Sequence, residues 1–217
     1  MGSNISDTGI EELLQLSSLS ELDVRGCRNI SKAGLEKFRD KASLRVLKIG
    51  SPKIDDEVMA LVGTMTGITS LALDTCNITD AGVAKLDTLP LTSFTVFQCS
   101  DVKDEGLKVL RNYPDLAQLT LRDVPAKCAC LSLLPHPEKL TSLTLGQSNI
   151  SDSEAAVLSK MTNLQKLDLS ITDVTDGVID TLSQLKNLKQ LTITETGIGE
   201  EGVQKLKAAL PDCAIRS

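Results

Sequence analysis

Residues 122–138 hold the densest group of reactive side chains in the sequence. Cys128, Cys130 and His136 lie within nine residues of one another, in a segment that also contains three prolines. Thiolate and imidazole groups bind Zn²⁺, but this spacing is not C-x-x-C and no fourth ligand is evident. A Cys–His nucleophilic pair is also available, although no third group is placed to orient the imidazole. We therefore favour a helix shortened by the prolines that flank His136, and predict no metal site and no catalytic residue.

Residues 197–202 read G-I-G-E-E-G after an apolar segment, which is the G-x-G-x-x-G pattern of dinucleotide-binding loops. In such loops the glycines let the backbone approach a pyrophosphate at the start of a helix. Here Ile198 and Gly202 align with Ile78 and Gly82 of an earlier I-T-D-x-G phrase. The pattern is therefore explained by an internal repeat, and we predict no cofactor.

An acidic residue recurs in each copy of this phrase, just before an expected helix. A carboxylate there can accept hydrogen bonds from free backbone N–H groups, and it favours the positive end of the helix dipole. A ladder of calcium sites is the alternative, but on a diverging convex surface the acids should lie too far apart to share ions. We therefore predict helix capping by Asp7, Asp56, Asp80, Asp104, Asp152, Asp176 and Glu200.

The glycine motif and the recurring acids are parts of one repeat, which residues 122–138 interrupt, and its first half is an apolar triplet of the form L-x-x-L-x-L. Period-2 alternation within each triplet predicts a short strand with one buried face. A small or thiol residue and the I-T-D-x-G phrase follow, and then apolar residues at helical spacing. Successive triplets are 22 to 25 residues apart, and their middle members are Leu22, Leu47, Leu71, Phe94, Leu119, Leu143, Leu167, Leu191 and Cys213.

Such strands cannot bury their own faces, so neighbouring repeats must stack. A helix is about 10 Å across, whereas paired strands lie about 4.8 Å apart. Helices on one side and strands on the other therefore force the stack to curve, with the strands on the concave face. The predicted fold class is an α/β solenoid with a concave parallel β-sheet and convex short helices.

The triplets, the I-T-D-x-G phrases and the cysteines at 27, 76 and 99 resemble the leucine-rich-repeat superfamily, in its ribonuclease-inhibitor-like or cysteine-containing subclass. The closing phrase L-P-D-C-A-I at 210–215 is similar to the ends of many bacterial members without assigned activity. The resemblance implies a horseshoe that binds partners and is not an enzyme, with reduced structural cysteines at the repeated position. We expect a single domain over 1–217, with a partial repeat at 1–15, about eight repeats over 16–209 and a capping strand at 210–217.

Composition narrows the kinds of partner. The 23 basic and 29 acidic residues give a net charge of −6, and there is no basic tract. Binding to nucleic acid or to an anionic membrane depends on positive charge, so we expect neither. The sequence contains neither an apolar run that could span a bilayer nor a cationic start followed by an apolar stretch. We expect a monomeric, cytoplasmic protein.

The outward strand positions should form three columns across the concave face. Interface hot spots are usually Trp, Tyr or Arg, and only Phe97 and Arg122, on successive strands, approach that description. We predict a protein or peptide partner at this pair, flanked by Asp74, Thr95, Gln118 and Thr120. In the alternative, threonines stand on the face because β-branching suits strands, and the functional surface is elsewhere or the array is a spacer. A second functional hypothesis, which rests on resemblance, is the substrate-recognition part of a ubiquitin-ligase F-box protein that lacks its F-box.

Overall fold

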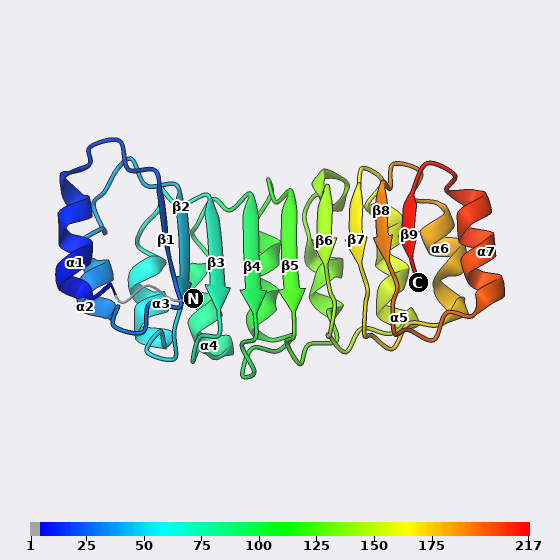
Figure 1. Ribbon diagram of the computed structural model, residues 1–217, viewed down its shortest axis with the longest axis horizontal. Helices are drawn as coiled ribbons and strands as arrows, with labels where there is room; N and C mark the ends of the chain where they lie inside the picture. Colours follow the sequence, from blue (N-terminus) through cyan, green and yellow to red (C-terminus); the bar gives the residue numbers. More distant parts are fainter. Residues whose placement is uncertain (1–4) are drawn as a thin grey trace.

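The computed structural model describes residues 5–217, and over this range the chain forms one parallel sheet of nine strands in chain order (Figure 1). Neighbouring strands pair residue for residue, so that Leu22 lies beside Leu47 and Leu47 beside Leu71. The α/β solenoid predicted from the repeat is therefore confirmed. The strands are β1 (Glu21–Arg25), β2 (Val46–Gly50), β3 (Ser70–Asp74), β4 (Ser93–Phe97), β5 (Gln118–Arg122), β6 (Ser142–Thr144), β7 (Lys166–Asp168), β8 (Gln190–Thr192) and β9 (Ala214–Arg216).

Short helices cover one face of the sheet, and the opposite face is open (Figure 1). In Figure 1 they lie behind the middle strands and outside the end strands, with α1 beyond β1 and α7 beyond β9, as a curved stack requires. Several are 3-10 helices, which span more length per residue than an α-helix. Within residues 5–217 no helix has the length and apolarity needed to cross a membrane. The helices are α1 (Asp7–Glu11), η1 (Glu12–Gln15), α2 (Lys32–Glu36), α3 (Asp56–Val62), α4 (Asp80–Val83), η2 (Ala84–Leu86), η3 (Gly106–Asn112), η4 (Ala129–Leu133), η5 (Pro137–Lys139), α5 (Asp152–Ala155), η6 (Ala156–Lys160), η7 (Asp176–Val178), α6 (Ile179–Ser183) and α7 (Glu200–Ala209).

The core is a continuous apolar spine between the sheet and the helices. The middle triplet residues from Leu22 to Leu191 are each 3 % exposed or less. Phe94 takes the place of a leucine in β4, and its ring meets Tyr113 edge to face, with 5.9 Å between centroids. The Tyr113 hydroxyl donates to Leu86 O at 3.0 Å, so this buried polar group is satisfied.

The last strand is displaced from its predicted register. Sequence spacing aligned Cys213 with Leu191, but the structure pairs Ile215 with Leu191 and Arg216 with Thr192. Leu210 ends the last helix instead of starting the strand, and it is buried there. Cys213 therefore precedes β9 and is only partly buried.

A left-handed residue follows the strand segment in most repeats and turns the chain back toward the core. The residue after it is the small or thiol side chain that the repeat predicted, as in Gln98 and Cys99. The second repeat differs: Ser51 directly follows β2 and is buried, whereas Pro52, which the repeat spacing aligns with Cys27 and Cys76, is exposed. The left-handed residues of this series are Gly26, Thr75, Gln98, Asp123, Gln147, Ile171 and Glu195.

Ile171 is poorly suited to its place in this series, and replacing it should stabilise the protein. Its φ is 55°, a conformation that costs a β-branched residue more than asparagine. Its side chain is 43 % exposed, so little packing is at stake. We expect Ile171→Asn to raise the free energy of unfolding by about 1 kcal/mol in urea denaturation. Ile171→Val keeps the branch and should show no gain, and an Asn variant less stable than wild type would contradict the prediction.

Candidate functional site

The reactive side chains of residues 122–138 do not come together. Cys128 and Cys130 are buried in the core, whereas His136 is exposed and lies 3.2 Å from Glu138 Oε1 through its Nδ1. Burial raises the pKa of the Cys128 thiol to about 12 and also raises the pKa of Cys130, so both stay protonated near neutral pH. Neither thiol has the thiolate character that a nucleophile or metal ligand needs. Two short 3-10 helices, η4 and η5, replace the regular helix here.

The glycines of residues 197–202 pack against the preceding repeat. A Cβ on Gly202 would lie 2.3 Å from Asp176 Oδ1, and Gly199 N donates to that same oxygen at 3.0 Å. An acidic side chain thus occupies the position where a phosphate would need open backbone N–H groups. The packing agrees with the repeat-based explanation of this motif.

The repeated aspartates do accept backbone hydrogen bonds, but from the next repeat and not from their own helix. Asp56 accepts from Thr79 N at 2.8 Å and from Thr79 Oγ1 at 2.6 Å. Asp152 binds Thr175 in the same way. The helices are capped instead by the residue before the acid, such as Thr79, whose hydroxyl accepts from Ala81 N. We call this bridge the aspartate clamp; its other members bond Asp7 to Ser31, Asp80 to Lys103, Asp104 to Lys127 and Ala129, and Asp176 to Gly199.

The clamp explains the glycine of the I-T-D-x-G phrase. A Cβ on Gly82 would lie 2.1 Å from Asp56 Oδ1, because the carboxylate of one repeat lies over the glycine of the next. The acids are consequently bonded along the stack and stand one repeat apart. Across residues 5–217 no three His, Cys, Asp or Glu side chains gather in a way that could hold a metal ion.

The six cysteines, all within the described range, carry free thiols. Those that follow the strands lie against strand-end carbonyls: Cys99 Sγ is 3.4 Å from Phe97 O, and Cys76 Sγ is 3.6 Å from Asp74 O. The Cys99 thiol also lowers the pKa of Cys76, so the two groups interact across the repeats. These cysteines pack as small core residues, as the repeat position indicated.

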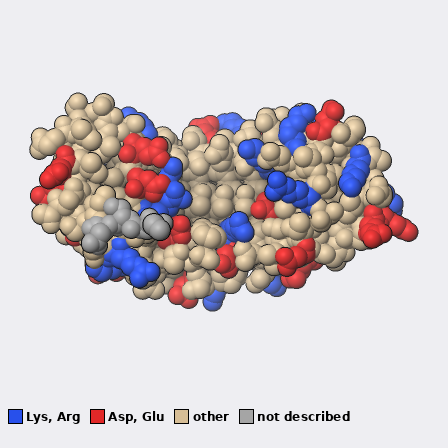
Figure 2. Space-filling view, viewed as in Figure 1, with Lys and Arg blue, Asp and Glu red and all other residues tan. Residues whose placement is uncertain are grey.

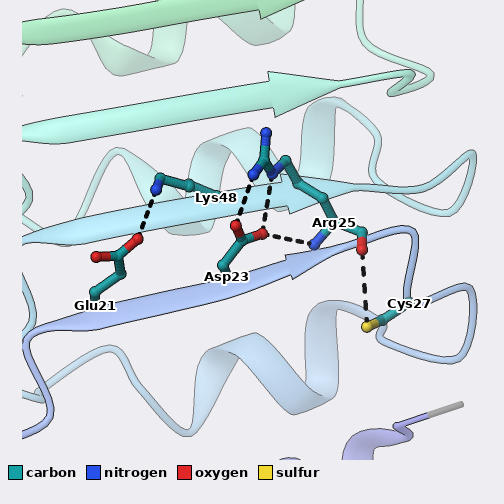
Figure 3. A network of polar contacts seen from close by, with 5 residues as sticks. All are labelled: Glu21, Asp23, Arg25, Cys27 and Lys48. Carbon is teal, nitrogen blue, oxygen red and sulfur yellow. Dashed lines mark hydrogen bonds and ion pairs between the residues drawn. The ribbon is translucent and has the colours of Figure 1, made fainter. Parts of the chain in front are cut away.

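On the concave face the central part of the middle strands carries no charged side chains, and charged residues lie along its edges and toward both ends (Figure 2). At the N-terminal end the charges are paired on the sheet itself. Glu21 accepts from Lys48 at 2.5 Å, and Arg25 lies across β2 with its guanidinium held by Asp23 at 2.7 Å (Figure 3). This bond lowers the pKa of Asp23, so the carboxylate stays charged.

A hollow of about 250 Å³ lies in the middle of this face. Its floor is formed by the small side chains of the central column, and Phe97 and Arg122 stand at the C-terminal ends of β4 and β5. Of the predicted site residues, Asp74, Thr95, Phe97, Thr120 and Arg122 line the hollow, and exposed Gln118 does not. The other lining residues are Arg25, Ala72 and Thr144.

Sequence reasoning missed these three for different reasons. Ala72 and Thr144 belong to the same column as Thr95 and Thr120, so strand register alone could have found them. Arg25 comes from β1 and lines the hollow only because its long side chain crosses β2 (Figure 3). Side-chain reach of this kind has no signal in the repeat pattern.

A curved stack of parallel strands and short helices, with the hollow on its strand face, defines the class: this is a leucine-rich-repeat fold. A family model described as "Leucine Rich repeat" matches residues 15–38 and 66–86. The structure is similar to an internalin from Listeria monocytogenes, with a TM-score of 0.67 and 22 % identity, over 99 % of this chain and 64 % of the other. A leucine-rich-repeat protein from Leptospira interrogans gives a TM-score of 0.60 and 19 % identity, over 97 % of this chain and 62 % of the other.

The chain thus has a leucine-rich-repeat fold with the architecture of these bacterial proteins, and it spans less than two thirds of the length of either. At this level of identity the likeness concerns the fold. Leucine-rich-repeat folds are typically non-catalytic and commonly mediate protein interactions.

Proposed function

We propose that this protein is a non-enzymatic interaction module that binds a protein or peptide partner in the hollow on its concave face. The observation that supports this proposal most directly is the hollow, in which Phe97 is the one large apolar side chain and lies beside alanine and threonine side chains. Aromatic and arginine side chains contribute most to interface energies, and Phe97 lies next to Arg122 in the paired strands. Five of the six residues singled out from the sequence meet there.

The test compares proteins recovered by the wild-type chain and by the double variant Phe97→Ala/Arg122→Ala. We expect at least a tenfold loss of the specific partner, because two anchor side chains leave the hollow. Lys166→Ala/Gln190→Ala changes the same face on β7 and β8, outside the hollow, and should recover the partner as wild type does. Equal recovery of every protein by the hollow variant would remove the site. A substrate-recognition part of a ubiquitin ligase would use the same face, and the identity of the recovered partner distinguishes this function from other protein binding.

A further inference from the structure

Two charged residues of the hollow lack an ion pair, unlike those at the N-terminal end of the face. Within residues 5–217, Asp74 and Arg122 form no salt bridge. Asp74 Oδ1 accepts from Thr75 Oγ1 at 2.8 Å, and Arg122 Nε donates to Gln147 Oε1 at 3.3 Å. A carboxylate has two acceptor oxygens and a guanidinium five N–H donors, so most of this capacity is open to a ligand.

Of the neighbouring charged residues, Arg25 is already paired with Asp23, and Asp123 does not line the hollow. The Arg25 guanidinium makes two hydrogen bonds to Asp23, at 3.0 and 2.7 Å. The Asp123 carboxylate accepts from the Gln98 amide at 3.0 Å, at the left-handed turn after the strand. The hydrogen bonds to Asp23 raise the pKa of Arg25, and the nearby negative charge of Asp74 raises it further. The cluster of Asp23, Arg25 and Asp74 nevertheless keeps one net negative charge beside Phe97, opposite Arg122.

The spacing of these groups suits one kind of partner segment. Asp74, Phe97 and Arg122 are register partners on β3, β4 and β5, so neighbouring members lie about 4.8 Å apart across the sheet. Their order is carboxylate, aromatic ring, guanidinium. Residues one turn apart on an α-helix are separated by about 5 Å along its axis, which matches this step. Same-face residues of an extended strand are about 6.7 Å apart, which does not.

We infer that the hollow binds an α-helix of the partner that crosses β3 to β5 and presents a basic residue to Asp74, a large apolar residue to Phe97 and an acidic residue to Arg122. The three residues stand one helical turn apart, at positions i, i+4 and i+7 or the reverse. The apolar side chain enters above Thr95 and Thr120, which line the hollow next to Phe97 and Arg122. This inference rests on the proposed function and specifies the partner's chemistry.

Three synthetic alanine-rich peptides test it, followed by NMR titration of the ¹⁵N-labelled protein. The first carries Lys, Phe and Glu at i, i+4 and i+7; the second carries them at i, i+2 and i+4; the third has Glu at both ends with the helical spacing. We expect the first to shift the amide signals of β3 to β5 and to bind about fivefold more tightly than either of the others. Arg122→Glu should instead favour a peptide with Lys at both ends by a similar factor.

Equal binding of the three peptides, or shifts confined to other strands, would overturn the inference. The proposed function is tested by a different experiment. It predicts that Phe97→Ala/Arg122→Ala no longer recovers the cellular partner, whichever peptide the wild-type protein prefers. If that loss occurs while the helical peptide shows no preference, the hollow binds a partner of different chemistry. Unchanged signals outside the hollow in the Arg122→Glu variant show that it is folded.

Discussion

Phe94→Ala should lower the free energy of unfolding by about 4 kcal/mol, one of the largest losses that a single side chain of this protein can cause. The ring is fully buried in β4, near the centre of the nine-stranded sheet, and packs at 75° against Tyr113. Repeats on both sides hold the backbone in register, so the cavity left by the ring cannot collapse. Urea denaturation followed by circular dichroism measures the loss.

Phe97→Ala is the matched control, because the two phenylalanines lie three residues apart on the same strand. Phe97 is on the concave side and only partly buried, so its removal should cost less than about 1 kcal/mol. A loss as large as that of Phe94→Ala would mean that Phe97 belongs to the core. In that case, reduced partner recovery by the hollow variant would reflect unfolding and not a lost contact.

The strands were predictable because each triplet shows the same alternation of apolar and polar residues. This alternation determines which side chains of β2 to β8 face the core, and the spacing of 22 to 25 residues between triplets determines which residues become neighbours. Leu143 and Leu167 could thus be paired without any structure, and the structure pairs them. The same logic placed Thr95 beside Thr120 on the concave face.

Where the prediction was wrong, backbone hydrogen bonds outweighed apolar spacing. Leu210, Cys213 and Ile215 fit the triplet pattern, but Ala214 N bonds to Lys189 O and Ile193 N bonds to Arg216 O, which fixes β9 two residues further along. The last strand has a neighbour on one side only, so fewer core contacts oppose such a shift. Partners of the aspartates were also misassigned, since a carboxylate at a helix start can bond within its own repeat or to the next, and sequence spacing is the same for both.

The residues that line the hollow could be predicted better than the extent of the hollow. Column positions gave Asp74, Phe97 and Arg122, because outward residues of paired strands are neighbours. Its limits depend on side-chain length: Arg25 reaches in from β1, whereas Gln118 on β5 does not line it. The repeat pattern encodes neither, and the place of the Arg25 side chain follows from its hydrogen bonds to Asp23.

Asp56 and Gly82 should be strongly coupled, because one repeat is joined to the next through this contact. Asp56→Ala removes the two hydrogen bonds that Thr79 donates to the carboxylate, and we expect a loss of about 2 kcal/mol. Gly82→Ala leaves these groups in place but puts a Cβ 2.1 Å from Asp56 Oδ1. The carboxylate must then leave Thr79, and we expect a loss of about 3 kcal/mol despite alanine's higher helix propensity.

The double variant Asp56→Ala/Gly82→Ala distinguishes coupling from two independent defects. With the carboxylate gone the added methyl meets no side-chain oxygen, and its remaining contact, 3.2 Å from Cα at position 56, needs a shift of only a few tenths of an ångström. The double variant should therefore be about as stable as Asp56→Ala alone. That corresponds to a coupling of about 3 kcal/mol in a double-mutant cycle measured by urea denaturation. Gly9→Ala is the control, since its Cβ would lie 3.6 Å from Ile5 Cγ2, an ordinary contact, and it should not destabilise. Additive losses would show that Asp56 and Gly82 act separately, and the aspartate clamp would then not account for the glycine of the repeated phrase.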